Sequence, residues 1–167
     1  MKRLSALVPL LILISSVACF SELANGPSQG DDRGSALLEW SGNKIEVNYG
    51  RPSLRGRQPE AMIKPGQVWR MGANDPTTLS TQASLKFGDQ QVPAGKYNLQ
   101  AKLVEPQKWH LLIESESGSP VAEVPFSLQK LDKSIEDLTI TLEKRDKGGR
   151  LVLQWGTLAL ATDFNSK

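Results

Sequence analysis

The feature that most restricts the fold of this chain is the alternation of apolar and polar residues in short segments. In IEVNY and RLVLQW, for example, every second residue is large and apolar. A period of two is typical of a strand that buries one face, because successive side chains point to opposite sides. No stretch of about ten residues shows the helical period instead. The sequence therefore predicts an all-β domain.

Turn residues separate these segments at intervals typical of an antiparallel sandwich. The separators include SGN, GDQQ, PAG, EPQ, ESGSP and DKGG, which are rich in residues that favour turns. We expect a single antiparallel β-sandwich, jelly-roll or immunoglobulin-like in size, with about eight to ten strands and little helix. Its clearest elements should be a hairpin over residues 36–49 and a C-terminal pair over residues 150–163, and one helical turn is expected at residues 60–64. The predicted core consists of Ile45, Val47, Tyr49, Leu85, Phe87, Leu99, Leu111, Ile113, Leu138, Ile140, Leu142, Leu151, Leu153 and Trp155.

The N-terminal residues have the layout of a secretory signal. Lys2 and Arg3 precede an apolar run that is too short for a standard membrane span, and small residues follow it. The next segment is polar and rich in glycine and serine, which is typical of a flexible tether. We therefore expect a signal peptide at residues 1–18, a tether at 19–34 and the β-sandwich domain at 35–165.

Cys19 is the only cysteine and directly follows the predicted cleavage site. In this position it resembles the lipidated first residue of a bacterial lipoprotein, and a lipid anchor at Cys19 is our preferred interpretation. Removal of the cysteine with the signal is the alternative. The sequence thus predicts an exported protein of the periplasm, the outer membrane or the cell surface, which contacts a membrane only through this anchor.

The charge balance is neutral once the signal is set aside. The chain has 20 basic and 18 acidic residues, and Lys2 and Arg3 are the only charged residues among the first 18, so 18 of each sign remain. A nucleic-acid-binding protein would carry a clustered basic excess. We therefore expect no nucleic-acid partner.

Residues suited to catalysis or metal binding are scarce. The chain has a single histidine, His110, within a strand-like segment, so Cys/His zinc sites lack ligands and a nucleophilic triad lacks an evident base. No glycine-rich phosphate loop is present. We predict no cofactor and no metal and favour a non-enzymatic role, while a hydrolase that uses paired carboxylates is a less favoured option.

Two arginine-bearing segments, YGRPSLRGR and VWRMGANDPTTLST, are the strongest candidates for a site. Guanidinium groups bind carboxylates and phosphates with paired hydrogen bonds, and asparagine, aspartate and threonine supply turn and hydroxyl chemistry. We expect the second segment to form a strand, a tight turn and another strand, which presents Arg70 beside Arg51. Alternatively, Arg70 pairs with Asp75 and braces the loop. The predicted ligand-binding residues are Arg51, Arg57, Arg70, Asn74, Asp75, Thr77 and Thr78.

Four motifs in order, YGRPSLRGR, VWRMGANDPTTL, VPAGKYNL and LVLQWG, resemble the bacterial domain-of-unknown-function family 2911. The resemblance extends over roughly residues 37–164 and implies an exported, β-rich protein without an established activity. Two functions follow as hypotheses. The first is a binding module for a small anionic or polar ligand, or a peptide, at the arginine site. The second is a structural or protein-interaction module of the envelope, in which the arginines brace loops.

Overall fold

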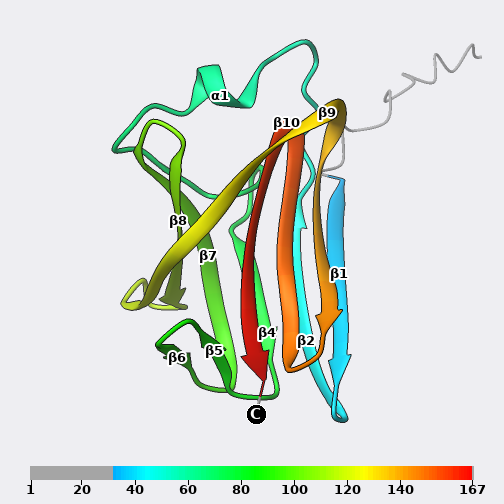
Figure 1. The fold of residues 1–167 in the computed structure, drawn as a ribbon, viewed down its shortest axis with the longest axis vertical. Coiled ribbons are helices and arrows are strands. Elements are labelled where there is room, and N and C mark those ends of the chain that lie inside the picture. The colour runs from blue at the N-terminus through cyan, green and yellow to red at the C-terminus, as the bar shows by residue number, and fades with distance from the viewer. Residues whose placement is uncertain (1–31, 167) are drawn as a thin grey trace, which may run out of the picture.

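The computed structural model describes residues 32–166, which form ten β-strands and one short helix. This all-β, antiparallel, sandwich-like architecture confirms the predicted fold class (Figure 1). The elements are β1 Arg33–Trp40, β2 Asn43–Gly50, α1 Pro59–Met62, β3 Val68–Trp69, β4 Thr77–Thr81, β5 Leu85–Phe87, β6 Gln90–Val92, β7 Gly95–Glu105, β8 Lys108–Ser115, β9 Pro120–Arg145 and β10 Gly148–Ser166. Within this range no helix is long and apolar enough to cross a membrane.

The boundaries of the predicted segments shift slightly. β1 begins at Arg33, two residues before the expected domain start at residue 35, and β10 ends at Ser166, one residue beyond the expected end. The predicted signal peptide, Cys19 and most of the tether lie outside the described residues.

The strands follow one hydrogen-bonded path that folds over on itself. The order is β1-β2-β4-β7-β8-β9-β10-β5-β6, and β3 pairs with β7 at the side of this path. β1, at one end of the path, faces β10 across the core, where a Cβ atom on Gly149 of β10 would lie 2.7 Å from Cδ2 of Leu38 in β1. The core therefore lies between the two layers that this folding produces.

The expected N-terminal hairpin is present as β1 and β2. Its register pairs Trp40 with Asn43 and Ala36 with Val47. The two residues between the strands, Ser41 and Gly42, have φ angles of +49° and +81°. Two consecutive left-handed residues are what a tight two-residue hairpin turn requires, because this geometry matches the twist of the strands.

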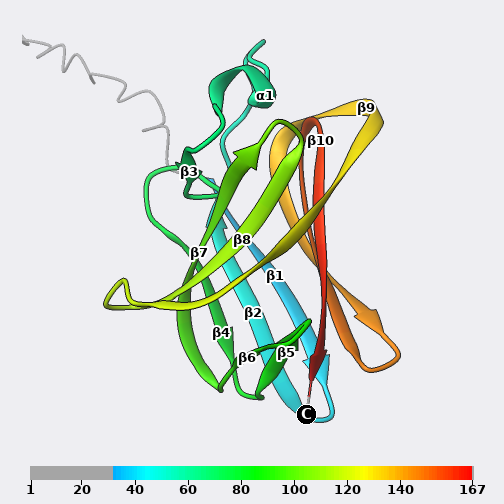
Figure 2. The same ribbon diagram turned by 60° about the vertical axis from the view of Figure 1, so that its left-hand side comes forward.

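The last two strands, β9 and β10, each turn back on themselves. The first limb of β9 pairs with β8, as Trp109 with Phe126, and its second limb pairs with β10, as Leu151 with Leu142. Figure 2 shows β9 rising diagonally across the molecule before it descends. In β10 the turn lies at Gly156, whose φ is +62°. The first limb contains the buried, alternating residues Val124 and Phe126, and the second contains Leu138 and Ile140.

The C-terminal pair predicted over residues 150–163 is formed by the two limbs of β10. They run side by side (Figure 1), and the amide of Ser166 donates a hydrogen bond to the carbonyl of Lys147 over 2.9 Å. A Cβ atom on Gly148 would lie only 2.2 Å from the carbonyl oxygen of Phe164, so the glycine permits this close approach.

The predicted core is confirmed with one exception. All of its residues are buried except Leu142, which is partly buried and packs against the core. The alternation identified the inward face because it reports side-chain direction directly. Met71, in the loop before β4, and Thr77, the first residue of β4, are also fully buried although neither was predicted as core.

The helix α1 forms the single helical turn expected in the long loop after β2, beginning at Pro59 rather than at residue 60. Proline suits the first turn of a helix because its missing amide hydrogen would have no partner there. Pro59 is buried against the turn of β10, where a Cβ atom on Gly156 would lie 2.9 Å from Cδ of Pro59. This contact places α1 over one end of the sandwich.

Candidate functional site

The predicted ligand-binding residues lie in two loops, residues 51–57 and residues 70–76, and in the start of β4. Arg51 follows β2 and forms two hydrogen bonds and one ion pair with other segments. Its amide donates to the carbonyl of Asp32 over 2.7 Å, and its Nη1 lies 3.3 Å from the Asp32 carboxylate. Its Nε donates to the carbonyl of Leu138 over 3.4 Å. The Arg51 side chain thus joins the start of β1 to the second limb of β9.

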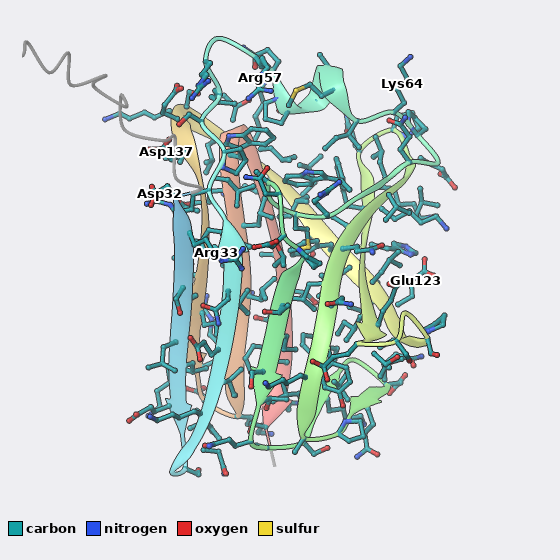
Figure 3. All side chains as sticks on the ribbon, turned by 180° about the vertical axis from the view of Figure 1, so that it is seen from behind. Asp32, Arg33, Arg57, Lys64, Glu123 and Asp137 are labelled. Atoms are coloured by element: carbon teal, nitrogen blue, oxygen red, sulfur yellow. The ribbon has the colours of Figure 1, made fainter. Side chains whose placement is uncertain are left out.

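The alternative prediction is that Asp75 pairs with Arg70 and braces the loop. The structure shows a different partner for Asp75. Its carboxylate instead accepts a hydrogen bond from Nη1 of Arg33 over 3.2 Å. Asp32 and Arg33, adjacent at the start of β1 (Figure 3), therefore form ion pairs with Arg51 of one loop and Asp75 of the other. These pairs hold the first residues of the domain to both arginine-bearing loops.

The segment 68–81 differs from the expected strand, tight turn and strand. β3 and β4 do not pair with each other, because both pair with β7, as Trp69 with Ala101 and Thr77 with Leu99. Residues 70–76 therefore form a loop that leaves the sheet after β3 and returns to it at β4, and both of these strands pair with β7. The strand ends before Arg70, and Met71 follows with φ of +56°.

Internal hydrogen bonds shape this excursion. Nη1 of Arg70 donates to the carbonyl of Asn74 over 2.6 Å, and Oγ1 of the buried Thr77 donates to the carbonyl of Met71 over 3.0 Å. A Cβ atom on Gly50 would lie 2.1 Å from the carbonyl oxygen of Ala73, so the loop packs directly on the end of β2. The composition of VWRMGANDPTTLST, with its polar residues and its glycine, is explained by these contacts.

The remaining predicted site residues are also used within the protein. Arg57 donates from Nε to the carbonyl of Leu54 and from Nη2 to the carbonyl of Ser53, each over 2.9 Å. Thr78 is half-buried in β4, where it pairs with Asn48 and Asn98. The guanidinium groups of Arg51, Arg57 and Arg70 all donate to protein groups, so the geometry accounts for them as braces. Ligand binding at these residues stays a prediction.

Two tryptophans from the predicted motifs form a stacked pair. The rings of Trp69 and Trp155 have centroids 5.7 Å apart and planes inclined by 14°. Trp155 is 3% exposed, and its Nε1 is buried without a hydrogen-bond partner among the described residues. Trp69 packs against the core from one side. Both therefore act as core residues, which is the more frequent role of tryptophan.

A separate concavity, which sequence reasoning did not identify, lies beneath α1. We call it the α1 groove. Its volume is about 650 Å³, and its walls come from the loop after α1, the tip of the β7–β8 hairpin, the first limb of β9 and the turn of β10. The lining residues are Glu60, Ile63, Pro65, Leu103, Pro106, Gln107, Trp109, Leu128, Lys130, Thr157 and Leu158.

The walls of the α1 groove are mainly apolar, with a few polar groups. Oε1 of Glu60 accepts a hydrogen bond from Oγ1 of Thr157 over 3.2 Å. Lys130 is the cross-strand partner of Leu158, so the two side chains share one face of the sheet. The one signal that could have indicated this site is Leu128, an apolar residue in the otherwise polar run SLQK.

The single histidine is not part of this groove. Nδ1 of His110 lies 2.7 Å from Oε1 of Glu123, and His110 is half-buried while its strand neighbours Trp109 and Leu111 are buried. This is the strand position that the alternation predicts. Across residues 32–166 no group of three or more His, Cys, Asp and Glu residues is arranged to hold a metal ion.

Comparison with known proteins identifies one family. The family model described as Protein of unknown function (DUF2911) matches residues 33–164, which is most of the chain. No curated protein matches the sequence. No solved structure matches it either.

Proposed function

The chain belongs to the DUF2911 family, and we propose that it is a non-enzymatic binding module that holds a small ligand in the α1 groove. The observation that carries this proposal is the groove itself. Its volume of about 650 Å³ is within the range of small-molecule sites, and it combines apolar walls with a few polar groups. Such walls exclude water from an apolar ligand, while the polar groups orient it.

The binding module is also proposed to be exported and lipid-anchored through Cys19. The support is the N-terminal signal pattern and the position of this cysteine. Residues 20–31 lie between Cys19 and the first described residue. Detergent phase partition of the native protein tests the anchor. Wild type should enter the detergent phase, and the Cys19→Ser protein should stay in the aqueous phase.

The second candidate function is a structural module of the envelope. It is favoured by the ion pairs that join Asp32 to Arg51 and Arg33 to Asp75, because they fix the start of the domain to both arginine-bearing loops. In this version the two loops serve the attachment of the domain to its tether. An anionic ligand at Arg51, Arg57 and Arg70 would have to compete with the protein groups to which these arginines donate.

A fluorescent probe distinguishes binding in the groove from a purely structural role. N-phenyl-1-naphthylamine is neutral and becomes fluorescent in apolar sites. The Cys19→Ser protein, exported with its own signal and purified without detergent, should bind it with a single saturable phase. Leu128→Gln should weaken this binding, because Leu128 lines the groove and is 37% exposed. The matched control is Leu37→Gln, which alters an exposed leucine on β1 outside the groove.

If Leu128→Gln and Leu37→Gln both bind the probe as tightly as the Cys19→Ser protein that carries neither change, the groove is not the binding site. Absence of saturable probe binding by the Cys19→Ser protein without further substitutions would favour the structural function instead.

A further inference from the structure

We infer that the α1 groove accepts an amphiphile with an anionic head group, whose apolar chain lies against the groove walls and whose head group contacts Lys130. This inference rests on the proposed function and names the class of ligand.

The apolar part of the ligand is indicated by the apolar side chains that line the groove, among them Ile63, Leu103 and the exposed Leu128. In residues 32–166 the exposed large hydrophobic residues are Leu37, Met62, Val68 and Leu128. Leu128 lines the groove, and Met62 and Val68 flank the loop that contributes Ile63 and Pro65 to its wall. An exposed leucine in the wall of an apolar concavity is a mark of a binding surface, whereas a single exposed apolar residue elsewhere needs no explanation.

The anionic part is indicated by Lys130. It is the basic residue among those that line the groove, and no acidic group of residues 32–166 lies within ion-pair distance of it. By contrast, Lys108 at the neighbouring hairpin tip lies 3.4 Å from Glu105. An ammonium group at the border of an apolar groove attracts a carboxylate, sulfonate or phosphate more strongly than the same group does in bulk water. The reason is that an apolar wall screens the two charges less than water does.

The acidic residue of the groove restricts where that head group lies. Glu60 is held toward the turn of β10 by its hydrogen bond with Thr157. Its negative charge repels an anion in the groove, whereas the positive charge of Lys130 attracts one. Removal of the Glu60 charge should therefore strengthen anion binding, and removal of the Lys130 charge should weaken it.

Displacement of N-phenyl-1-naphthylamine from the Cys19→Ser protein by decanoate, 1-decanol and decylammonium tests the inference, because the three share a chain and differ in head-group charge. We expect decanoate to bind best and decylammonium worst. Lys130→Met should weaken decanoate binding by about threefold or more and leave 1-decanol binding unchanged. Glu60→Gln should move decanoate binding in the opposite direction. Lys133→Met, an exposed lysine of the same strand outside the groove lining, is the matched control.

Three results would overturn the inference in distinguishable ways. Equal displacement by all three compounds, unaffected by Lys130→Met, would leave the groove as a binding site without preference for an anion. Strongest displacement by decylammonium, lost in Glu60→Gln, would show that the groove selects a cation. No displacement by any compound, together with probe binding that is unchanged in Leu128→Gln, would remove the proposed function as well.

Discussion

Arg150 and Asp163 are thirteen positions apart within one continuous strand, yet they form a two-point ion pair, with Nε to Oδ1 at 2.6 Å and Nη2 to Oδ2 at 2.8 Å. A straight strand would separate these residues by roughly 40 Å. The pair exists because β10 reverses at Gly156, and it ties the two limbs together near their open ends.

This ion pair should make stability depend on pH in the acid range. Hydrogen bonds from Arg150 lower the pKa of the Asp163 carboxyl from its usual 3.8, and the same bonds raise the pKa of Arg150. A carboxyl whose folded pKa is lowered stabilises the fold above its unfolded pKa and loses that contribution as the pH falls through the folded value. Both side chains are more than one-third exposed, which limits the contribution to about 1 kcal/mol or less.

Urea unfolding measures this contribution as the difference between wild type and Asp163→Asn. The difference should be present at neutral pH and shrink as the pH falls below about 4. Asp146→Asn is the control, because Asp146 lies in the neighbouring turn and has no ion pair in the described part of the chain. A difference that stays constant down to strongly acid pH would contradict the assignment.

Gly50→Ala should be strongly destabilising. The added Cβ would lie 2.1 Å from the carbonyl oxygen of Ala73, which is backbone and cannot rotate away. We expect a loss of about 3 kcal/mol or more in the free energy of unfolding, at or above the upper end for overpacking. Gly42→Ala separates this clash from backbone strain, since Gly42 has φ of +81° and open space around it. That control should cost only about 1 kcal/mol. Similar losses for the two variants would disprove the packing of the loop on β2.

Tyr97→Phe should cost about 1 kcal/mol, because it removes the hydrogen bond from the Tyr97 hydroxyl to the carbonyl of Pro93 at 2.8 Å. A tyrosine that bonds to the backbone a few residues upstream is a known corner device of β-sandwiches. Tyr49→Phe offers a comparison, since its buried hydroxyl reaches the carbonyl of Ile140 only at 3.3 Å, whereas the bond of Tyr97 is part-buried. Chemical denaturation should show the larger loss for Tyr97→Phe, and the reverse order would refute the role of this corner.

Arg70→Ala should reduce stability by about 1 kcal/mol or less. Arg70 is exposed and donates to the Asn74 carbonyl, and the acid nearby, Asp75, keeps its pairing with Arg33. Arg51→Ala should cost more, because the half-buried Arg51 bonds to both Asp32 and Leu138. Melting temperatures with and without inorganic phosphate add a second readout. A phosphate-induced rise in wild type that is absent in Arg70→Ala would support ligand binding at the arginines rather than bracing.

The strands and their inward faces were largely predictable from the sequence. Side-chain direction in a strand is a local property, so alternation in LTITLE and RLVLQW indicated Leu138, Ile140, Leu151 and Leu153 as core. The burial of Met71 was not predictable in this way, because it lies in a loop in a left-handed conformation and has no periodic neighbours.

The all-β class, the two hairpins and most of the core follow from the amino-acid sequence, since these depend on residue alternation and on turn chemistry within a few positions. Its motifs also indicated the family over roughly residues 37–164, and the family model matches residues 33–164. The pairing of Asp75 with Arg33 rather than Arg70, and the groove lined by residues from Glu60 to Leu158, depend on the three-dimensional arrangement of the strands. Ion-pair partners and cavities depend on distances between segments far apart along the chain, and those distances are set by how β9 and β10 fold over the first strands.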